Sequence, residues 1–153
     1  MPEISPSPDF GANIDRLFTD RSMGLQAWGT YGILWPVVHF ELGVAPDLGR
    51  GSVLVVPQVP DGQSSVAGSA IQLGRGSIDV AATRTPTVLT ARVTRHLSVS
   101  LTIGTVLPAG KRVTGVTLNG APAAYTLVTT DRGQEVRVAA GSSGAADLVV
   151  NVA

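Results

Sequence analysis

The longest apolar run of the chain, residues 22–42, limits its possible folds more than any other stretch. Both tryptophans and one of the two tyrosines fall in this run. At helical steps of three and four, one stripe of the run contains Trp28, Tyr31, Trp35, Val38 and Leu42. A helix that is apolar nearly all round is buried on most of its sides. We therefore expect one long apolar α-helix here, and the rest of the chain is too small and too β-rich to cover it.

Prolines and glycines set the limits of this expected helix. Pro36 should kink the helix or end its regular part. Gly43 suits the left-handed position after a helix C-terminus, and Pro46 prevents the helix from continuing. The run is long enough to cross a bilayer, but glycines, Pro36 and Glu41 interrupt it and its aromatic residues are not confined to its ends. We therefore expect a helix buried in protein, and no membrane span.

The composition argues against several classes of partner. With 11 basic and 11 acidic residues the formal net charge is zero, so the chain as a whole should attract neither nucleic acid nor an anionic membrane. Charged residues make up only 14% of the chain, against about 25% in an average globular domain. The chain has no cysteine, and its two histidines, His39 and His96, lack the spacing of metal ligands. We expect no metal site and no cofactor.

From Ser52 onward the apolar pattern changes from a period near four to a period of two. Short alternating segments, separated by turn residues, follow at 52–57, 66–74, 76–84, 87–94, 97–104, 113–120, 124–131, 134–141 and 146–153. This cadence is typical of an antiparallel β-sandwich. We therefore predict a mainly β chain with two parts, an N-terminal loop and helix over residues 1–50 and a C-terminal β-sandwich domain over residues 51–153.

Turn residues indicate how some of these strands are joined. Asn119-Gly120 is a favoured pair for a tight hairpin turn, and Asp131-Arg132-Gly133 is a second hairpin signal. Segments 87–94 and 97–104 should form a further hairpin, joined through Arg95-His96.

No catalytic motif stands out from the residues alone. The chain has no Gly-x-Ser-x-Gly nucleophile elbow. Carboxylates that could serve glycoside chemistry gather near the helix, at Glu3, Asp9, Asp15, Asp20, Glu41 and Asp47. A solvated loop position or a helix cap is the better explanation for each of them. Trp28, Tyr31 and Trp35 could stack on sugar rings, but aromatic residues of a buried helix are more often part of a core.

The helix and its exit resemble a known superfamily. Residues 25–47, LQAWGTYGILWPVVHFELGVAPD, and the following Val55-Val56-Pro57 resemble the end of the catalytic barrel in six-hairpin glycosidases. These include glucoamylase-like, glycogen-debranching-like and α-L-rhamnosidase-like enzymes. In them the last helix of an (α/α)6 barrel leads through a Gly-x-x-Pro exit into a C-terminal β-sandwich. The resemblance implies that this chain is the C-terminal portion of such a glycoside hydrolase.

The resemblance also implies site residues and a missing partner. Asp9 would correspond to the general base that lies before the last helix in some relatives. Gln26 and Trp28 would be parts of a sugar-site wall. An (α/α)6 barrel needs about twelve helices, so most of the catalytic barrel is absent from this sequence. We therefore expect no turnover by the chain alone, with a carbohydrate and the missing barrel domain as partners.

Two other functions stay open. The chain could be an autonomous carbohydrate- or protein-binding β-sandwich, although Tyr125 is the only aromatic residue of its β-part, which argues against a broad stacking platform. It could instead be a structural subunit that oligomerises through the helix. An in-frame barrel sequence encoded upstream of Met1 would favour the glycosidase hypothesis over both.

Overall fold

A computed structural model describes residues 27–142 and 144–153. The chain divides into two compact units, Met1–Val37 and Val38–Ala153. The first unit contributes the helix to the described residues, and the second contains the strands.

A short helix takes the place of the expected long one. The α-helix α1 spans Ala27–Pro36, and the chain then makes a π-helical turn, η3, over Val37–Glu41. Pro36 explains why α1 ends there, because proline has no N–H to donate and its ring crowds the carbonyl four residues before it. The prediction of one long apolar helix over residues 22–42 is therefore wrong in length, and residues 22–26 lie outside the described part of the chain.

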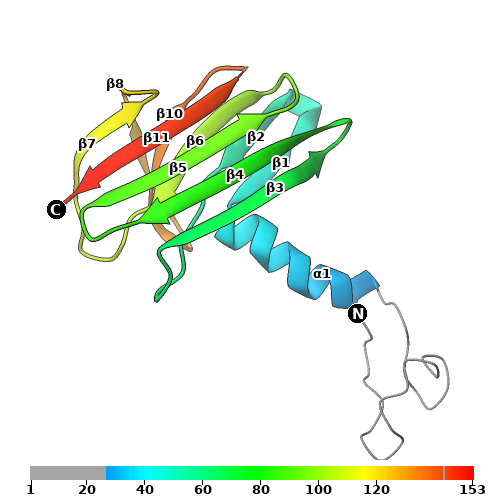
Figure 1. Ribbon diagram of the computed structural model, residues 1–153, viewed down its shortest axis with the longest axis horizontal. Coiled ribbons are helices and arrows are strands. Elements are labelled where there is room, and N and C mark those ends of the chain that lie inside the picture. The colour runs from blue at the N-terminus through cyan, green and yellow to red at the C-terminus, as the bar shows by residue number, and fades with distance from the viewer. Residues whose placement is uncertain (1–26, 143) are drawn as a thin grey trace, which may run out of the picture. The chain divides into compact units, whose positions relative to one another are not determined.

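Two sheets make up the second unit, as Figure 1 shows. The five-stranded sheet has the strand order β1 (Val44–Asp47), β2 (Ser52–Val55), β6 (Ser100–Val106), β10 (Gly133–Ala139) and β9 (Thr126–Thr130). The six-stranded sheet has the order β3 (Ser65–Leu73), β4 (Gly76–Arg84), β5 (Val88–Arg95), β11 (Ala145–Val152), β7 (Val113–Leu118) and β8 (Ala121–Pro122). The chain is mainly β, as the sequence predicts.

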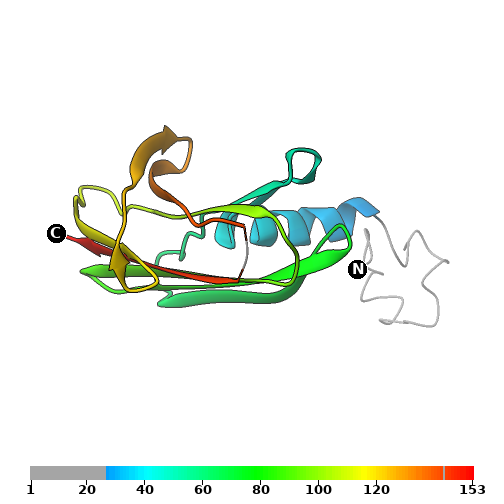
Figure 2. The same cartoon turned by 90° about the horizontal axis from the view of Figure 1, so that it is seen from above.

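The two sheets lie face to face around one aliphatic core, and Figure 2 shows them as two layers. Ile103 and Val136 of the first sheet are fully buried together with Ile78 and Leu148 of the second. Among the described side chains no aromatic ring is buried, and aliphatic residues, mostly valine, leucine and isoleucine with a few alanines, fill the space between the layers. Neighbouring strands are antiparallel except β2 and β6, which run parallel. The predicted all-antiparallel arrangement is wrong at this one pair.

Two hairpin turns form where the sequence places them. Asn119 and Gly120 both have positive φ, 52° and 80°, which is the backbone of the tight turn between β7 and β8. Asp131 and Arg132 form the two-residue turn between β9 and β10, since Thr130 pairs with Gly133.

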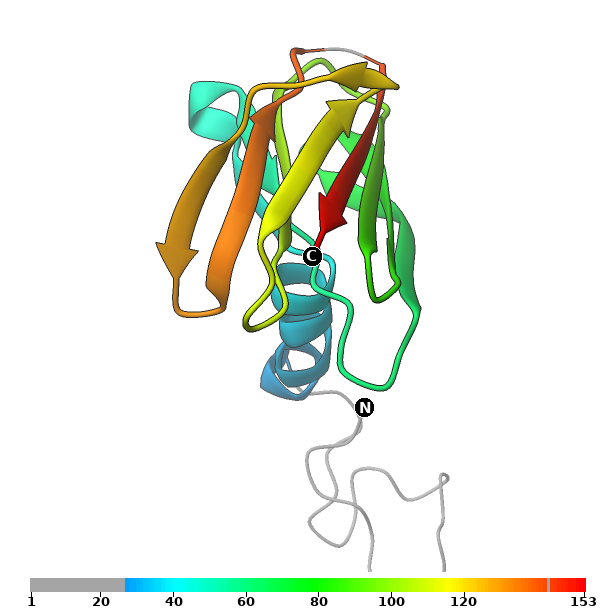
Figure 3. The same ribbon diagram turned by 90° about the vertical axis from the view of Figure 1, so that its left-hand side faces the viewer.

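The expected hairpin through Arg95-His96 does not form, because β5 and β6 belong to different sheets. Arg95 is buried and its guanidinium donates to the carbonyl oxygens of Gly141, Gly144 and Val99 at 2.7, 3.0 and 3.2 Å. These bonds join the β5–β6 crossover to the connection between β10 (orange) and β11 (red), two strands of different layers in Figure 3. Arg95, which the sequence indicates as a turn residue, is therefore a buried side chain that links the β5–β6 connection to the β10–β11 connection.

The strand β1 extends the sandwich toward the N-terminus. It pairs with β2 in the register Val44↔Val55, and the 3-10 turn η4 (Leu48–Arg50) connects them. Val44 is fully buried in the core. The compact β unit accordingly runs from Val38, which places β1 in it, whereas the sequence analysis divides the chain at residue 51.

Candidate functional site

The structure leaves the predicted sugar-site residues untested. Asp9 and Gln26 lie outside the residues that it describes. Trp28 lies on α1, where only its backbone is described. The roles of these three residues remain predictions.

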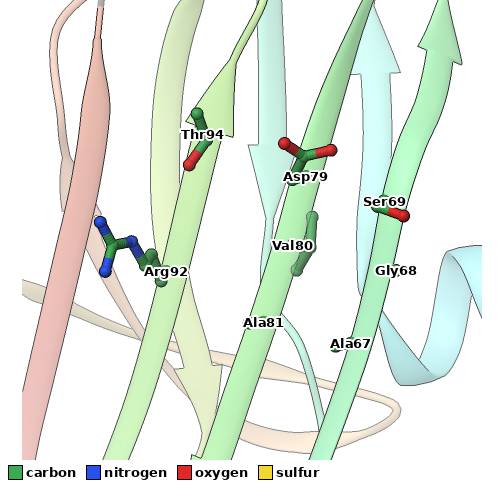
Figure 4. A pocket seen from close by; sticks show the side chains of 8 residues that line it. All are labelled: Ala67, Gly68, Ser69, Asp79, Val80, Ala81, Arg92 and Thr94. Carbon is green, nitrogen blue, oxygen red and sulfur yellow. The ribbon is translucent and has the colours of Figure 1, made fainter.

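The six-stranded sheet carries an open concavity of about 380 Å³ on its outer face, which Figure 4 shows. Asp79 of β4, Ser69 of β3, and Arg92 and Thr94 of β5 supply its polar side chains. The remaining walls are Ala67, Gly68, Val80 and Ala81. Most of these side chains are small, so the surface is shallow and nearly flat.

Asp79 holds an irregularity in the neighbouring strand. The pairing of β3 with β4 shifts between Gly68 and Ile71, and Ala70 in this bulge has a φ of 53°. One carboxylate oxygen of Asp79 accepts the Ala70 N–H at 2.8 Å, and the other lies 2.9 Å from Nε2 of His96. The Ala70 N–H, and then the His96 hydrogen bond, hold the pKa of Asp79 below its ordinary value. An ionised carboxylate with both oxygens engaged is poorly suited to act as a general acid.

A second concavity continues the first across the same face. It shares Ala81 and Arg92 with the first and reaches Asp147 of β11, which pairs with Arg92 at 3.4 Å. Each of these two concavities is lined by a single carboxylate, Asp79 in one and Asp147 in the other. Glycoside hydrolysis uses two carboxyl groups about 5–10 Å apart across the scissile bond, and neither concavity supplies such a pair from the described residues.

The segment that leaves the helix is fixed to the sandwich by its backbone. Gly43 has a φ of 64°, and a Cβ there would overlap the carbonyl oxygen of Val56. Val56 N donates to Gly43 O at 3.0 Å, and Gln58 N donates to Glu41 O at 2.9 Å. Glycine is therefore required at position 43 for two reasons: the backbone has a positive φ, and Val56 lies too close for a side chain. The sequence predicts this left-handed glycine.

A charged cluster, Arg132-Glu135-Arg137, lies beside this exit. Glu135 of β10 is only 1% exposed and accepts from Arg132 and Arg137, each at 2.7 Å. Thr130 donates a further hydrogen bond to it at 3.0 Å. Arg132 also donates to the carbonyl oxygens of Val56 at 2.9 Å and Phe40 at 3.2 Å. The cluster therefore joins the β9–β10 hairpin to the end of η3 and to the segment after β2.

Two opposing effects set the protonation of Glu135. Its burial alone would raise the pKa, but the hydrogen bonds from Arg137 and Arg132 outweigh burial and hold the pKa below its ordinary value. The buried carboxylate is therefore ionised at neutral pH and is neutralised by two guanidinium groups. This arrangement stabilises the exit and leaves Glu135 inaccessible to a substrate.

A third concavity, of about 360 Å³, lies on the five-stranded sheet. Tyr125, in the connection between β8 and β9, and Arg137 are its largest lining residues. Thr102, Ala124, Thr126, Val128 and Ala139 complete the lining. It combines an exposed aromatic ring with a cationic side chain.

An exposed aromatic pair marks α1. The rings of Tyr31 and Trp35 stack with their centroids 5.0 Å apart and their planes at 24°. Tyr31 is 57% exposed and Leu34 is 55% exposed. A surface of this kind suits contact with other protein.

The described part of the chain shows neither a metal-ligand cluster nor a membrane-spanning helix. Within residues 27–142 and 144–153, no three acidic or histidine side chains gather as metal ligands would. Over the same residues, no helix has the length and apolar character to cross a membrane.

The charged cluster is not among the residues expected from the sequence, although part of it has a sequence signal. Glu135 and Arg137 are two residues apart on one strand, so they share a face. Arg132 belongs to the tight turn just before them. Alternation alone could have paired Glu135 with Arg137, but the bonds from Arg132 to Phe40 and Val56 cross more than seventy residues and have no local signal.

Comparison with known proteins supports the fold. No family model and no curated protein matches the sequence. Among solved structures, the chain is similar to the α-L-rhamnosidase from Dictyoglumus thermophilum, with a TM-score of 0.52 and 13% sequence identity. The match covers 74% of this chain and 13% of the rhamnosidase chain. The chain therefore shares its fold with a small part of a glycosidase.

Proposed function

We propose that this chain is the C-terminal portion of a six-hairpin glycoside hydrolase, formed by the last helix of the (α/α)6 barrel and an accessory β-sandwich. The observation that carries the proposal is the order of its parts. A helix ends at Pro36, the chain leaves through Gly43, and a two-sheet sandwich follows whose fold is similar to part of an α-L-rhamnosidase.

In this proposal the sandwich holds the segment that follows the last barrel helix. Arg132 and Gly43 fix the exit segment to the sandwich by side-chain and backbone hydrogen bonds. A fixed exit would restrict how a barrel helix leaves its barrel, and so would help to hold that helix in place. The exposed Tyr31 and Leu34 would then pack against the neighbouring barrel helices.

Catalysis would need residues that this chain does not contain. Asp9 would act as the general base, and Gln26 and Trp28 would line the sugar site, all against an acid supplied by an earlier barrel helix. The chain alone would not turn over glycosides, because a single carboxylate lacks the second group that the reaction requires.

The test has a genetic arm and a biochemical arm. An in-frame (α/α)6 barrel upstream of Met1 is expected, and the joined protein should hydrolyse aryl glycosides, with aryl α-L-rhamnosides tested first. The purified 153-residue chain should show no turnover on the same substrates, beside an Asp9→Asn control. Turnover by the chain alone that disappears in Asp9→Asn would overturn the proposal.

A second function, self-association through α1, is favoured by the exposed apolar residues Tyr31 and Leu34. Light scattering should then show a concentration-dependent dimer or larger species. The double variant Tyr31→Lys/Leu34→Lys should shift it toward monomer. A monomer at all concentrations would reject this alternative.

A further inference from the structure

The concavity beside Tyr125 has the parts of a small sugar-binding site. Tyr125 is 41% exposed, so its ring is accessible to a ligand. The ring lies beside Arg137, Thr102 and Thr126 in a space of about 360 Å³. Sugar rings present apolar C–H faces, and these stack on aromatic side chains.

The charge of this site comes from Arg137, the member of the charged cluster that lines it. Arg132, Glu135 and Arg137 together carry two positive charges and one negative charge. No carboxylate is among the residues that line the concavity. The cluster therefore keeps one net positive charge, and Arg137 is its member that lines this concavity, which favours a ligand with one negative charge.

Hydrogen bonds to Glu135 fix the Arg137 side chain where it lines the concavity. Its Nε and one Nη atom are both bound to Glu135, at 2.9 and 2.7 Å. The remaining Nη1 has no hydrogen-bond partner among the described residues, while Arg137 lines the concavity. A guanidinium N–H paired with a carboxylate forms a strong, charge-assisted hydrogen bond. Because Glu135 already holds the side chain, little conformational entropy is lost when a ligand binds.

Hydroxyl groups complete the match. Thr102 of β6 and Thr126 of β9 line the concavity, and a threonine hydroxyl can both donate to and accept from a sugar hydroxyl. We propose that this concavity binds a hexuronate, a pyranose sugar that carries one carboxylate, with its ring against Tyr125 and its carboxylate on Arg137. One aromatic ring is enough for one sugar residue, so the lack of a broad aromatic platform does not argue against it.

This inference is independent of the proposed glycosidase origin. All the residues that carry it belong to the β unit, and none belongs to α1 or to the missing barrel. A chain encoded without an upstream barrel would leave the site unchanged. Failure of binding would equally leave the barrel hypothesis untouched.

The experiment is an amide NMR titration of the full 153-residue chain with a matched pair of ligands. Methyl glucuronide and methyl galacturonide are compared with methyl glucoside and methyl galactoside, which carry a CH2OH group in place of the carboxylate. At least one uronide should produce saturable shifts centred on Ala124, Thr126 and Ala139. The neutral sugars should bind about tenfold more weakly, and sodium chloride should weaken uronide binding.

Two variants separate stacking from general surface effects. Tyr125→Ala should weaken uronide binding by about three- to tenfold. Leu127→Ala is the matched control, because Leu127 is exposed on β9 but does not line the concavity, and it should leave binding unchanged. Arg137→Gln should remove the preference for uronide over neutral sugar, and a one-dimensional spectrum checks that it is folded.

Four results would overturn the proposal. The first is the absence of saturable shifts with both uronides. The second is equal affinity for uronides and neutral sugars in the unaltered chain. The third is equal shifts with sodium acetate, since that would reduce the site to a charge without sugar recognition. Unchanged affinity in Tyr125→Ala would likewise remove the ring from the site and overturn it.

Discussion

Glu135 on the five-stranded sheet and Asp79 on the six-stranded sheet both help to hold irregular backbone, but one carboxylate is buried and the other is exposed to water. Each accepts hydrogen bonds that fix an irregular piece of backbone. Asp79 holds the bulge at Ala70, and Glu135 orients Arg132, which holds the carbonyl oxygens of Phe40 and Val56. The side chain of Glu135 is 1% exposed, whereas that of Asp79 is 40% exposed.

The difference in exposure decides what each carboxylate contributes to stability. Water and salt screen the Asp79–His96 pair, so it should contribute little. Glu135 is shielded from water, and its two arginine partners are themselves largely covered, at 15% and 25% exposure. Removing one member of a buried group leaves uncompensated charge, which is far more costly. Loss of Glu135 should therefore lower the stability of the whole β unit, whereas loss of Asp79 should affect only the backbone near it.

The largest effect should follow Glu135→Ala. This change leaves Arg132 and Arg137 without their shared carboxylate, and we expect a loss of about 3–5 kcal/mol in the free energy of unfolding. Urea denaturation at neutral pH measures it. Asp79→Ala is the matched control and should cost far less. Equal losses in the two variants would contradict the comparison.

The second effect tests the helix exit next to this cluster. Gly43→Ala should cost about 2–4 kcal/mol, because alanine is strained at positive φ and its Cβ would meet Val56 O. Gly62→Ala is the matched control, since Gly62 has a φ of 84° but open space around it. It should cost only about 1 kcal/mol. If Gly43→Ala were as mild as Gly62→Ala, the exit would be loosely held.

The third effect is a dependence of stability on pH. The pKa of Glu135 is lowered in the folded state, so its contribution is complete above its ordinary value of 4.5 and is lost as the pH falls through the folded-state pKa. We therefore expect the stability gap between the unaltered chain and Glu135→Gln to be constant near neutral pH and to shrink below about pH 4.5. Denaturation curves at several pH values from 7 to 3 measure the gap. A gap that widens on acidification would contradict the lowered pKa.

Much of the sandwich could be predicted because its signals are local. Residues 76–84 place Ile78, Val80 and Ala82 on one face, and β4 spans the same residues. Asn119-Gly120 forms its turn because two adjacent residues with positive φ are a property of the pair itself. The strands that follow Ser52 are found close to their expected bounds for the same reason.

The remainder depends on contacts distant in sequence. Arg95-His96 reads as a hairpin turn, but Arg95 binds carbonyl groups more than forty residues later and the chain crosses to the other sheet. β1 has no alternation in Val-Ala-Pro-Asp and becomes a strand by pairing with β2. The apolar run predicts a helix up to residue 42, but the regular α-helix ends at Pro36, the residue that the sequence marks as a kink or an end. The concavity beside Tyr125 joins β6, β9 and β10, so only the fold brings its residues together.

The smallest effect on stability should follow a change at Asp79. It tests whether an exposed carboxylate stabilises only the backbone next to it. Asp79→Ala removes the acceptor of the Ala70 N–H, so hydrogen exchange at that amide should become faster. The denaturation midpoint should hardly move, because the lost pair is open to water on both sides. Asp79→Asn keeps an oxygen that can accept the same N–H, and it should preserve slow exchange at Ala70. Faster exchange spread over β3, β4 and β5 together would show that the bulge supports the whole sheet, and Asp79 would then resemble Glu135 in its effect.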